Sequence, residues 1–332
     1  MIINPYKNGV GKIKSYLEKK CPKALEKHIL PRSVFVFDRL FTHKSKKLAR
    51  KYLSMKEFPV FQTIEVETIN RCNGSCAFCP VNKHNDPRPF KIMDESLLTS
   101  ILTQLQEINY SGSFGLYSNN EPLLDKRLID LLKRSREALP NAELFLFTNG
   151  SLLTIEKFIE IRKYLDKLII DNYNDQLEAN EKVKIIDDYN EKNPSDCKVF
   201  IYLRKENEVL TNRGGQANNR TSNKFKLKSS CMYPFEQVIV RPDGKLSLCC
   251  NDATGKITMG DLTKERLIDI WRGEKYQNLR KMMLKDRSLH QMCKNCDVVT
   301  PKFASGSTFH IKNIFKMLAN KNTAPKNKRL HT

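Results

Sequence analysis

The sequence predicts an α/β protein with a parallel β-sheet, followed by a smaller unit built on a β-hairpin. Between residues 62 and 204, short apolar runs of strand type alternate with amphipathic helix patterns. This alternation is typical of βαβ units and therefore of a parallel sheet. After residue 231 it gives way to a hairpin pattern, one helix and a pair of cysteines. With about five or six βα units, the sheet is expected to be open or a partial (β/α)6 barrel.

Five apolar runs are the expected strands, and they cover residues 62–70, 114–120, 143–150, 167–173 and 197–204. The first expected helix begins after Asp94, a good N-cap, and repeats leucine and isoleucine at helical spacing. Further helices are expected around residues 128–132, 155–159 and 178–190. In such sheets the functional groups lie at the carboxyl ends of the strands. Those ends comprise residues 71–79, 118–122, 148–150, 171–174 and Arg204.

The smaller unit begins with a predicted hairpin over residues 236–250. Asp243 and Gly244 provide the Asp-Gly turn that favours a tight hairpin loop. A helix around residues 267–271 follows, and then a Cys-x2-Cys pair. We therefore expect four segments: a basic N-terminal extension at 1–58, a barrel at 59–225, the hairpin unit at 226–300 and a basic tail at 301–332.

The composition, with 40% hydrophobic and 29% charged residues among 332, is that of a globular protein with a full core. No apolar run reaches the length of about eighteen residues that a membrane span requires. The N-terminus lacks the apolar centre of a signal peptide, so a cytoplasmic location is expected.

The net charge of +21 lies mainly at the two ends of the chain. Residues 1–58 contain 15 Lys/Arg and 4 Asp/Glu, and residues 301–332 contain 7 Lys/Arg and no acid. Residues 309–320 also have the pattern of a basic amphipathic helix. Two interpretations are open: the ends dock peripherally on the inner face of an anionic membrane, or they pack on the barrel and solvate it. Nucleic-acid binding is disfavoured, because the charges are not interleaved with aromatic residues on a binding module.

Three of the ten cysteines, Cys72, Cys76 and Cys79, lie together after the first expected strand. In a cytoplasmic chain, cysteines are metal ligands or redox groups more often than they are parts of disulfide bonds. Three thiolates can hold three irons of a 4Fe–4S cluster and leave the fourth iron open to a small chelating molecule. The alternative interpretations are a zinc site and chance clustering.

The spacing Cys-x3-Cys-x2-Cys at the end of a first strand resembles the signature of the radical S-adenosylmethionine (SAM) superfamily. The resemblance covers about residues 62–300. It implies a radical SAM barrel, a SAM-binding 4Fe–4S cluster, SAM itself, and an external reductant such as flavodoxin or ferredoxin. Phe78 stands where that family places an aromatic residue against the adenine.

Further cofactor contacts are implied by the same resemblance. Asn119 to Pro122 corresponds to the family's Gly-Gly-Glu-Pro stretch at the methionine end of SAM, with Glu121 and the proline matching and asparagines such as Asn120 replacing the glycines. Asparagine tolerates positive φ best among the non-glycine residues, so the turn can persist. The remaining implied contacts are Asn149 in the third strand end, Asp171 near the ribose and Arg204 at the fifth strand end. Asp171 and Arg204 are equally compatible with solvated or salt-bridged side chains.

Asn212 to Gly215 reads Asn-Arg-Gly-Gly and resembles the family's Asn-Arg-Ala-Gly, in which Arg213 would contact SAM or substrate. A Gly-Gly linker explains the same residues.

Four later cysteines, Cys231, Cys249, Cys293 and Cys296, resemble the SPASM/twitch modules of radical SAM enzymes. The absence of cysteines after Cys296 matches the shorter form with one auxiliary 4Fe–4S cluster, and the spacing is close to the inositol-amine dehydrogenase type of butirosin biosynthesis. A structural zinc with four cysteine ligands is the alternative. Cys250 could replace Cys249 as a ligand, but Cys249 fits the Gly-x4-Cys spacing of the module.

The resemblance implies that a substrate hydrogen atom is abstracted and that a fully ligated auxiliary cluster accepts an electron. We expect an oxidoreductase acting on a carbohydrate-like alcohol, small or lipid-linked, in polysaccharide, glycolipid or secondary metabolism. A base must accept the hydroxyl proton, and the sequence does not identify it. The alternatives are a peptide- or protein-modifying radical SAM/SPASM maturase and a non-catalytic, zinc-stabilised binding protein.

Overall fold

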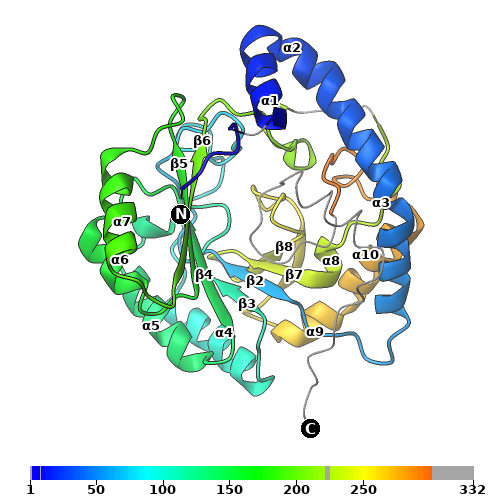
Figure 1. Ribbon diagram of the computed structural model, residues 1–332. Coiled ribbons are helices and arrows are strands. Elements are labelled where there is room, and N and C mark those ends of the chain that lie inside the picture. The colour runs from blue at the N-terminus through cyan, green and yellow to red at the C-terminus, as the bar shows by residue number, and fades with distance from the viewer. Residues whose placement is uncertain (1, 8, 221–224, 301–332) are drawn as a thin grey trace.

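The computed structural model describes residues 2–7, 9–220 and 225–300, and its strands form one mixed sheet (Figure 1). The sheet has nine strands in the order β1-β6-β5-β4-β3-β2-β7-β8-β9. The strands are β1 (Ile2–Ile3), β2 (Thr63–Val66), β3 (Ser113–Gly115), β4 (Glu143–Thr148), β5 (Lys167–Tyr173), β6 (Lys198–Arg204), β7 (Gln237–Val240), β8 (Lys245–Ser247) and β9 (Thr258–Asp261). The predicted fold class is confirmed: an α/β fold with a parallel sheet and a C-terminal antiparallel hairpin.

Strands β2 to β6 are parallel and adjacent in chain order, and a helix follows each of the first four. These helices are α4 (Glu95–Glu107), α5 (Leu128–Ala138), α6 (Ile155–Ile161) and α7 (Glu181–Lys192). Figure 1 shows them on the outer side of the curved sheet. Asp94 is the N-cap residue of α4, as the sequence predicts. The four crossover connections bring the carboxyl ends of β2 to β6 to one rim.

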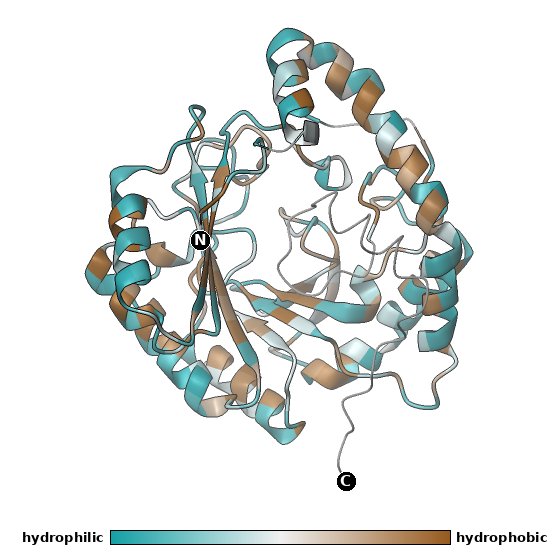
Figure 2. Ribbon diagram, in the orientation of Figure 1, coloured by the Kyte–Doolittle hydropathy of each residue, from teal (hydrophilic) through white to brown (hydrophobic). Residues whose placement is uncertain are grey.

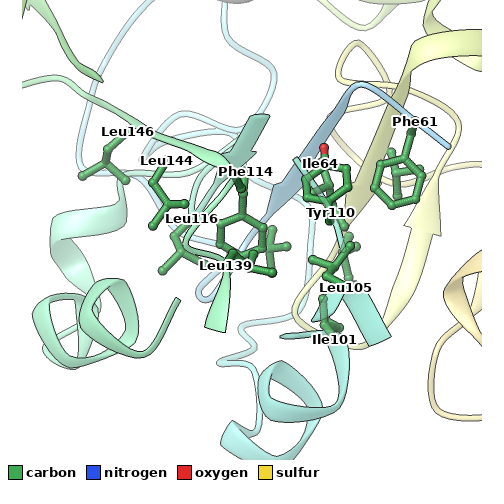
Figure 3. Packing of buried hydrophobic residues seen from close by; sticks show 14 of the residues in the cluster. Phe61, Ile64, Ile101, Leu105, Tyr110, Phe114, Leu116, Leu139, Leu144 and Leu146 are labelled. Atoms are coloured by element: carbon green, nitrogen blue, oxygen red, sulfur yellow. The ribbon is translucent and has the colours of Figure 1, made fainter. Parts of the chain in front are cut away.

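Alternation along the strands separates an outer core from the barrel interior. Ile64 and Phe114 pack against α4 with Ile101 and Leu105, and all four are buried (Figure 3). Figure 2 shows the apolar residues on the strands and on the helix sides that face them. Successive strand residues point to opposite faces, so Glu65, between Ile64 and Val66, faces the interior.

The hairpin unit continues the barrel sheet, because β7 pairs in parallel with β2 as well as antiparallel with β8. Gly244 in the hairpin turn has φ +81°, a conformation that favours glycine. The unit also contains α8 (Tyr233–Glu236), α9 (Leu267–Arg272), α10 (Glu274–Lys285) and the 3-10 turn η4 (Arg287–Leu289). The sequence did not predict β9 or α10. The domain boundary near residue 226 stays a prediction.

The N-terminal extension is mostly helical: α1 (Gly9–Lys20), α2 (Pro22–Ala24), the π-helical turn η1 (Leu25–Ile29) and α3 (Leu30–Leu53). The short strand β1 pairs with β6 at the edge of the sheet. On the other side, α3 runs beside α10 (Figure 1). Asp38 of α3 is fully buried and accepts hydrogen bonds from the backbone N–H groups of Lys228 and Ser229, at 2.8 Å each. The helix α3 is therefore joined to the segment that leads into Cys231.

Within the part of the chain that the structure describes, each helix is too short or too polar to span a bilayer. The predicted amphipathic pattern at 309–320 lies outside the described residues.

Candidate functional site

The loop after β2 brings Cys72, Cys76 and Cys79 together around Gly74. A Cβ atom placed on Gly74 would lie 3.4 Å from Cys72 Sγ and 3.8 Å from Cys76 Sγ, so both thiols border this glycine. Burial raises the pKa of Cys72 to about 11, and negative charge at Glu121 and Cys79 adds to the rise. Burial and the neighbouring Cys79 and Cys72 likewise raise the pKa of Cys76. All three thiols are free, so the loop fits a group that binds thiolates and relieves this mutual repulsion.

Arg88 fixes the cysteine loop to the ends of β2 and β3. Its Nη1 donates to Glu67 Oε2 at 3.0 Å, and its Nη2 donates to the carbonyl oxygens of Asn70 and Asn119 at 3.1 and 3.0 Å. Asp86 also receives two hydrogen bonds from the same guanidinium group. This buried network positions the loop without occupying the thiols.

Glu121 connects the end of β3 with the end of β4. Its Oε1 accepts from Thr148 Oγ1 at 2.7 Å, and its Oε2 accepts from the backbone N–H of Asn149 at 2.8 Å. The Asn149 side chain in turn donates to Asn73 Oδ1 at 2.8 Å, inside the cysteine loop. Burial raises the pKa of Glu121, although these hydrogen bonds oppose the rise. The structure thus places the predicted Glu121 and Asn149 beside the cysteines.

Phe78, Asp171 and Arg204 lie on the same rim, over β5 and β6. The Phe78 ring packs against Tyr173, with centroids 6.0 Å apart. Arg204 donates to Glu208 Oε2 at 2.8 Å, and its Nη1 lies 3.8 Å from Asp171 Oδ1. Burial raises the pKa of Asp171 despite the nearby arginine. Arg204 therefore has carboxylate partners of its own, and its role as a SAM contact stays a prediction.

Four buried polar atoms that border the barrel interior have no hydrogen-bond partner among the described residues. They are Asn120 Nδ2, Asp171 Oδ1, Arg213 Nε and Gln237 Oε1. Buried polar groups in native proteins are nearly always paired, so such a set indicates groups that bind a polar ligand. The observation fits a polar cofactor and a polar substrate inside the barrel.

Glu65 lies in the barrel interior among these groups and was not identified from the sequence. Its carboxylate accepts from Ser118 Oγ at 2.7 Å and from Gln237 Nε2 at 2.8 Å. Burial raises the pKa of Glu65 to about 7, against the hydrogen bond from Ser118. The available signal was its position, because a carboxylate between two buried apolar residues of a parallel strand must face the interior.

Arg213 connects the rim with the hairpin unit. Its Nη2 donates to Asn119 Oδ1 and to the carbonyl oxygen of Cys250, the latter at 3.0 Å. Asn119 Nδ2 donates to the same carbonyl at 3.2 Å. Arg213 therefore joins the rim to the hairpin unit, and its predicted contact with cofactor or substrate stays a prediction.

The second group of cysteines, Cys231, Cys249, Cys293 and Cys296, also lies close together, in the hairpin unit. Burial raises the pKa of Cys249 strongly, and negative charge at Cys250, Cys231, Cys293 and Cys296 contributes. Cys250 has different surroundings: burial raises its pKa to about 12, the Glu65 charge contributes next, and Tyr233 is its hydrogen-bond partner. Cys249 thus lies with the other three thiols, whereas Cys250 borders the interior near Glu65.

Within the described part of the chain these four cysteines form no disulfide bond, as a closed metal cluster requires. Among the described residues, no three His, Cys, Asp or Glu side chains are close enough to hold one metal ion between them.

Comparisons with known proteins agree with this geometry. The family described as the radical SAM superfamily matches residues 66–189, and the SPASM iron–sulfur cluster-binding domain matches residues 231–297. The S-adenosyl-L-methionine-dependent 2-deoxy-scyllo-inosamine dehydrogenase of Niallia circulans is 31% identical over 243 residues, which are 73% of this chain and 94% of that protein.

Two solved structures illustrate the fold. BtrN in complex with AdoMet and 2-DOIA has a TM-score of 0.61 and 29% identity, and the match covers 73% of this chain and 94% of that one. Streptococcus suis SuiB bound to precursor peptide SuiA has a TM-score of 0.50 and 12% identity, and the match covers 77% and 73% of the two chains. The likeness to SuiB shows the fold alone.

Proposed function

Because the chain belongs to the radical SAM superfamily and carries a SPASM iron–sulfur domain, we propose that it oxidises a secondary alcohol of a small, carbohydrate-like molecule. It is an enzyme of that family, and its cofactors are a SAM-binding 4Fe–4S cluster, an auxiliary iron–sulfur cluster and SAM. The related dehydrogenase of Niallia circulans is named for a 2-deoxy-scyllo-inosamine substrate, and this name supports an aminocyclitol or sugar as the substrate class.

The residues that would hold the cofactors are those gathered on the rim and behind the hairpin. We propose Cys72, Cys76 and Cys79 as ligands of the SAM-binding cluster and Cys231, Cys249, Cys293 and Cys296 as ligands of the auxiliary cluster. The proposed SAM contacts are Phe78, Asn120, Glu121, Asn149, Asp171 and Arg204. When bound, the cofactors supply a 5′-deoxyadenosyl radical that removes a hydrogen atom and an acceptor for the electron that the substrate then loses.

The observation that carries the proposal is the buried carboxylate of Glu65 in a polar barrel interior. Oxidation of an alcohol releases the hydroxyl proton, and a base with a pKa near neutrality can accept it. Glu65 has such a pKa, about 7, and Ser118 and Gln237 hold its carboxylate in place. Arg213 Nε and Asn120 Nδ2 are free donors that can orient substrate hydroxyl groups.

The experiment that tests this function uses substrates deuterated at a carbinol carbon. We expect deuterium in 5′-deoxyadenosine and a ketone product from at least one sugar or aminocyclitol, with 2-deoxy-scyllo-inosamine as the first candidate. An external reductant of the flavodoxin or ferredoxin class starts the reaction. If no member of a cyclitol and sugar panel transfers deuterium, the proposal is wrong. Deuterium transfer from a peptide instead would establish the maturase alternative.

We further propose that the enzyme works at an anionic membrane surface, which would suit a lipid-linked carbohydrate. The support comes from α1 and α3, where exposed lysines and arginines accompany exposed apolar side chains such as Val36 and Leu40, each 54% exposed. Figure 2 shows hydrophobic and hydrophilic stretches alternating along α3. Exposed apolar groups beside basic ones are the combination that binds membrane interfaces.

A further inference from the structure

Arg287 is a buried arginine beside the second group of cysteines whose hydrogen-bonding capacity is mostly unused. The side chain is 2% exposed. Its Nη1 donates to the carbonyl oxygen of Val298 at 2.9 Å. Its Nε and Nη2 are buried and have no partner among the described residues. Unpaired buried guanidinium groups are costly, so these two donors indicate a missing acceptor.

The charges around Arg287 identify that acceptor. Burial disfavours the charged guanidinium, but negative charge at Cys231, Cys296 and Cys293 outweighs burial and raises the pKa of Arg287. Asp38 contributes less, and both of its oxygens already accept backbone hydrogen bonds. When these cysteines ionise to hold a metal cluster, they provide the counter-charge for the free donors of Arg287.

The first cysteine loop has no such unpaired cation among the described charges that act on it. Negative charge at Glu121 contributes to the raised pKa of Cys72, and Glu206 contributes at Cys76. The buried cation near this loop, Arg88, is neutralised by ion pairs with Glu67 and Asp86 at 3.0 and 2.9 Å. Both sites have carboxylates nearby, Asp252 and Asp297 in the second, but the second site also has a buried cation with unpaired donors beside its thiols.

We propose that Arg287 raises the reduction potential of the auxiliary cluster, by placing a buried positive charge and free N–H donors beside its ligand sulfurs. Reduction adds one negative charge to a site that is already anionic, and a nearby cation in a low-dielectric interior stabilises the reduced form more than the oxidised form. Hydrogen bonds to cluster sulfurs act in the same direction. The inference rests on the auxiliary site of the proposed function and explains why electrons would pass to that site.

The test measures the potential of the auxiliary cluster alone. Replacing Cys72, Cys76 and Cys79 by alanine removes the other cluster, and the full chain is then reconstituted and titrated potentiometrically by electron paramagnetic resonance. In this background Arg287→Met is expected to lower the equilibrium constant for one-electron reduction of the cluster at least tenfold. This corresponds to a reduction potential lower by about 59 mV or more. Arg287→Lys, which keeps the charge, is expected to retain most of the original potential.

Arg280 provides the matched control. It is also fully buried in this unit with free Nη1 and Nη2, but its guanidinium lies 3.7 Å from the Phe58 ring centroid and 4.2 Å from that of Trp271. Burial lowers the pKa of Arg280 to about 9, and the charge that opposes this is Tyr276 rather than a thiol. Arg280→Met is therefore expected to leave the potential unchanged.

An unchanged potential in Arg287→Met at full iron content would overturn the inference, as would zinc in place of iron at this site. If the methionine variant does not retain the cluster, Arg287→Gln and Arg287→Lys are compared at equal iron content. A lower potential in the glutamine variant supports the inference, and equal potentials refute it. Because the titration needs no substrate, its result is independent of whether the alcohol oxidation is found.

Discussion

Glu65 is the side chain on which the proton transfer of the proposed reaction depends. Glu65→Gln should lower substrate oxidation by about 100-fold or more, because the amide cannot accept the hydroxyl proton, while reductive SAM cleavage continues. In the unmodified enzyme, the rate should rise with pH through about 7, since burial raises the pKa of Glu65 to about 7 and the base is the deprotonated form. The measurement is the ketone yield between pH 5.5 and 8.5. Glu160→Gln, at a half-exposed position on α6, is the control. A pH profile that survives in Glu65→Gln would assign the base elsewhere.

Cys249 and Cys250 are neighbours with different surroundings, which allows a matched test of the ligand set. Cys249→Ala should reduce the iron of the reconstituted protein from about eight to about four atoms, because a cubane cluster then lacks one of its thiolates. Cys250→Ala should keep about eight, because the Glu65 charge acts on its thiol more strongly than Cys231 does, and Tyr233 is its hydrogen-bond partner. Iron and sulfide analysis after anaerobic reconstitution distinguishes the two. The reverse pattern would make Cys250 the ligand.

At the residue scale, the cysteines could be predicted because their spacing alone brings them together. Residues whose roles depend on neighbours from distant parts of the chain could not be predicted. A short loop with three cysteines must bring its thiols together, whatever the rest of the chain does. The role of Glu65 depends on which face of β2 is interior and on Ser118, in the loop after β3, and Gln237, in β7. Arg287 was not predictable, because its significance lies in the partners that it lacks.

Among the elements, the basic helix α3 also has a structural role, because its Asp38 anchors the segment that leads into Cys231. Asp38→Ala should destabilise the protein by about 1–3 kcal/mol, because the backbone N–H groups of Lys228 and Ser229 lose a buried charged acceptor. The loss should also reduce retention of the auxiliary cluster, since this segment leads into Cys231. Thermal unfolding and iron content measure both effects. Lys47→Ala, exposed on the same helix, should change neither, and an Asp38→Ala protein as stable as the parent would contradict the anchoring role.

The order of strands and helices between residues 62 and 204 followed from local periodicity, but their joining to other parts did not. The predicted 62–70 strand is shorter in the structure, where β2 ends at Val66 and the rest leads into the cysteine loop. The hairpin was predicted from its Asp-Gly turn, yet its parallel pairing with β2 is non-local and has no sequence signature. The N-terminal helices take their places through similar contacts, such as Lys14 Nζ with Glu208 Oε1 at 2.9 Å.

In the whole molecule, β2 is the strand that relates the two cysteine sites. Its carboxyl end leads into the first cysteine loop, and its pairing with β7 brings in the hairpin that precedes Cys249. Glu65 lies on this strand, and its neighbour Cys250 directly follows Cys249 of the second site. A substrate bound at Glu65 would therefore lie between the two cofactor sites, as an oxidation with separate hydrogen and electron acceptors requires.

The outer face of the N-terminal helices determines where the whole molecule would bind. Lys12, Lys19 and Lys20 of α1 are exposed beside Ile13 and Tyr16, which are 61% and 62% exposed. Each lysine near an anionic surface contributes about 1 kcal/mol, so replacing all three by glutamine should weaken binding to phosphatidylserine-containing vesicles by roughly 100-fold. Vesicle co-sedimentation measures the loss, and binding should also weaken as salt shortens the Debye length. The control replaces the exposed lysines of α7, at positions 182, 184 and 192, by glutamine. It has the same net charge as the α1 variant and should bind vesicles almost as well as the unmodified protein. Equal losses in both triple variants would show that net charge, rather than this surface, governs binding, and binding to neutral vesicles alone would remove the electrostatic explanation.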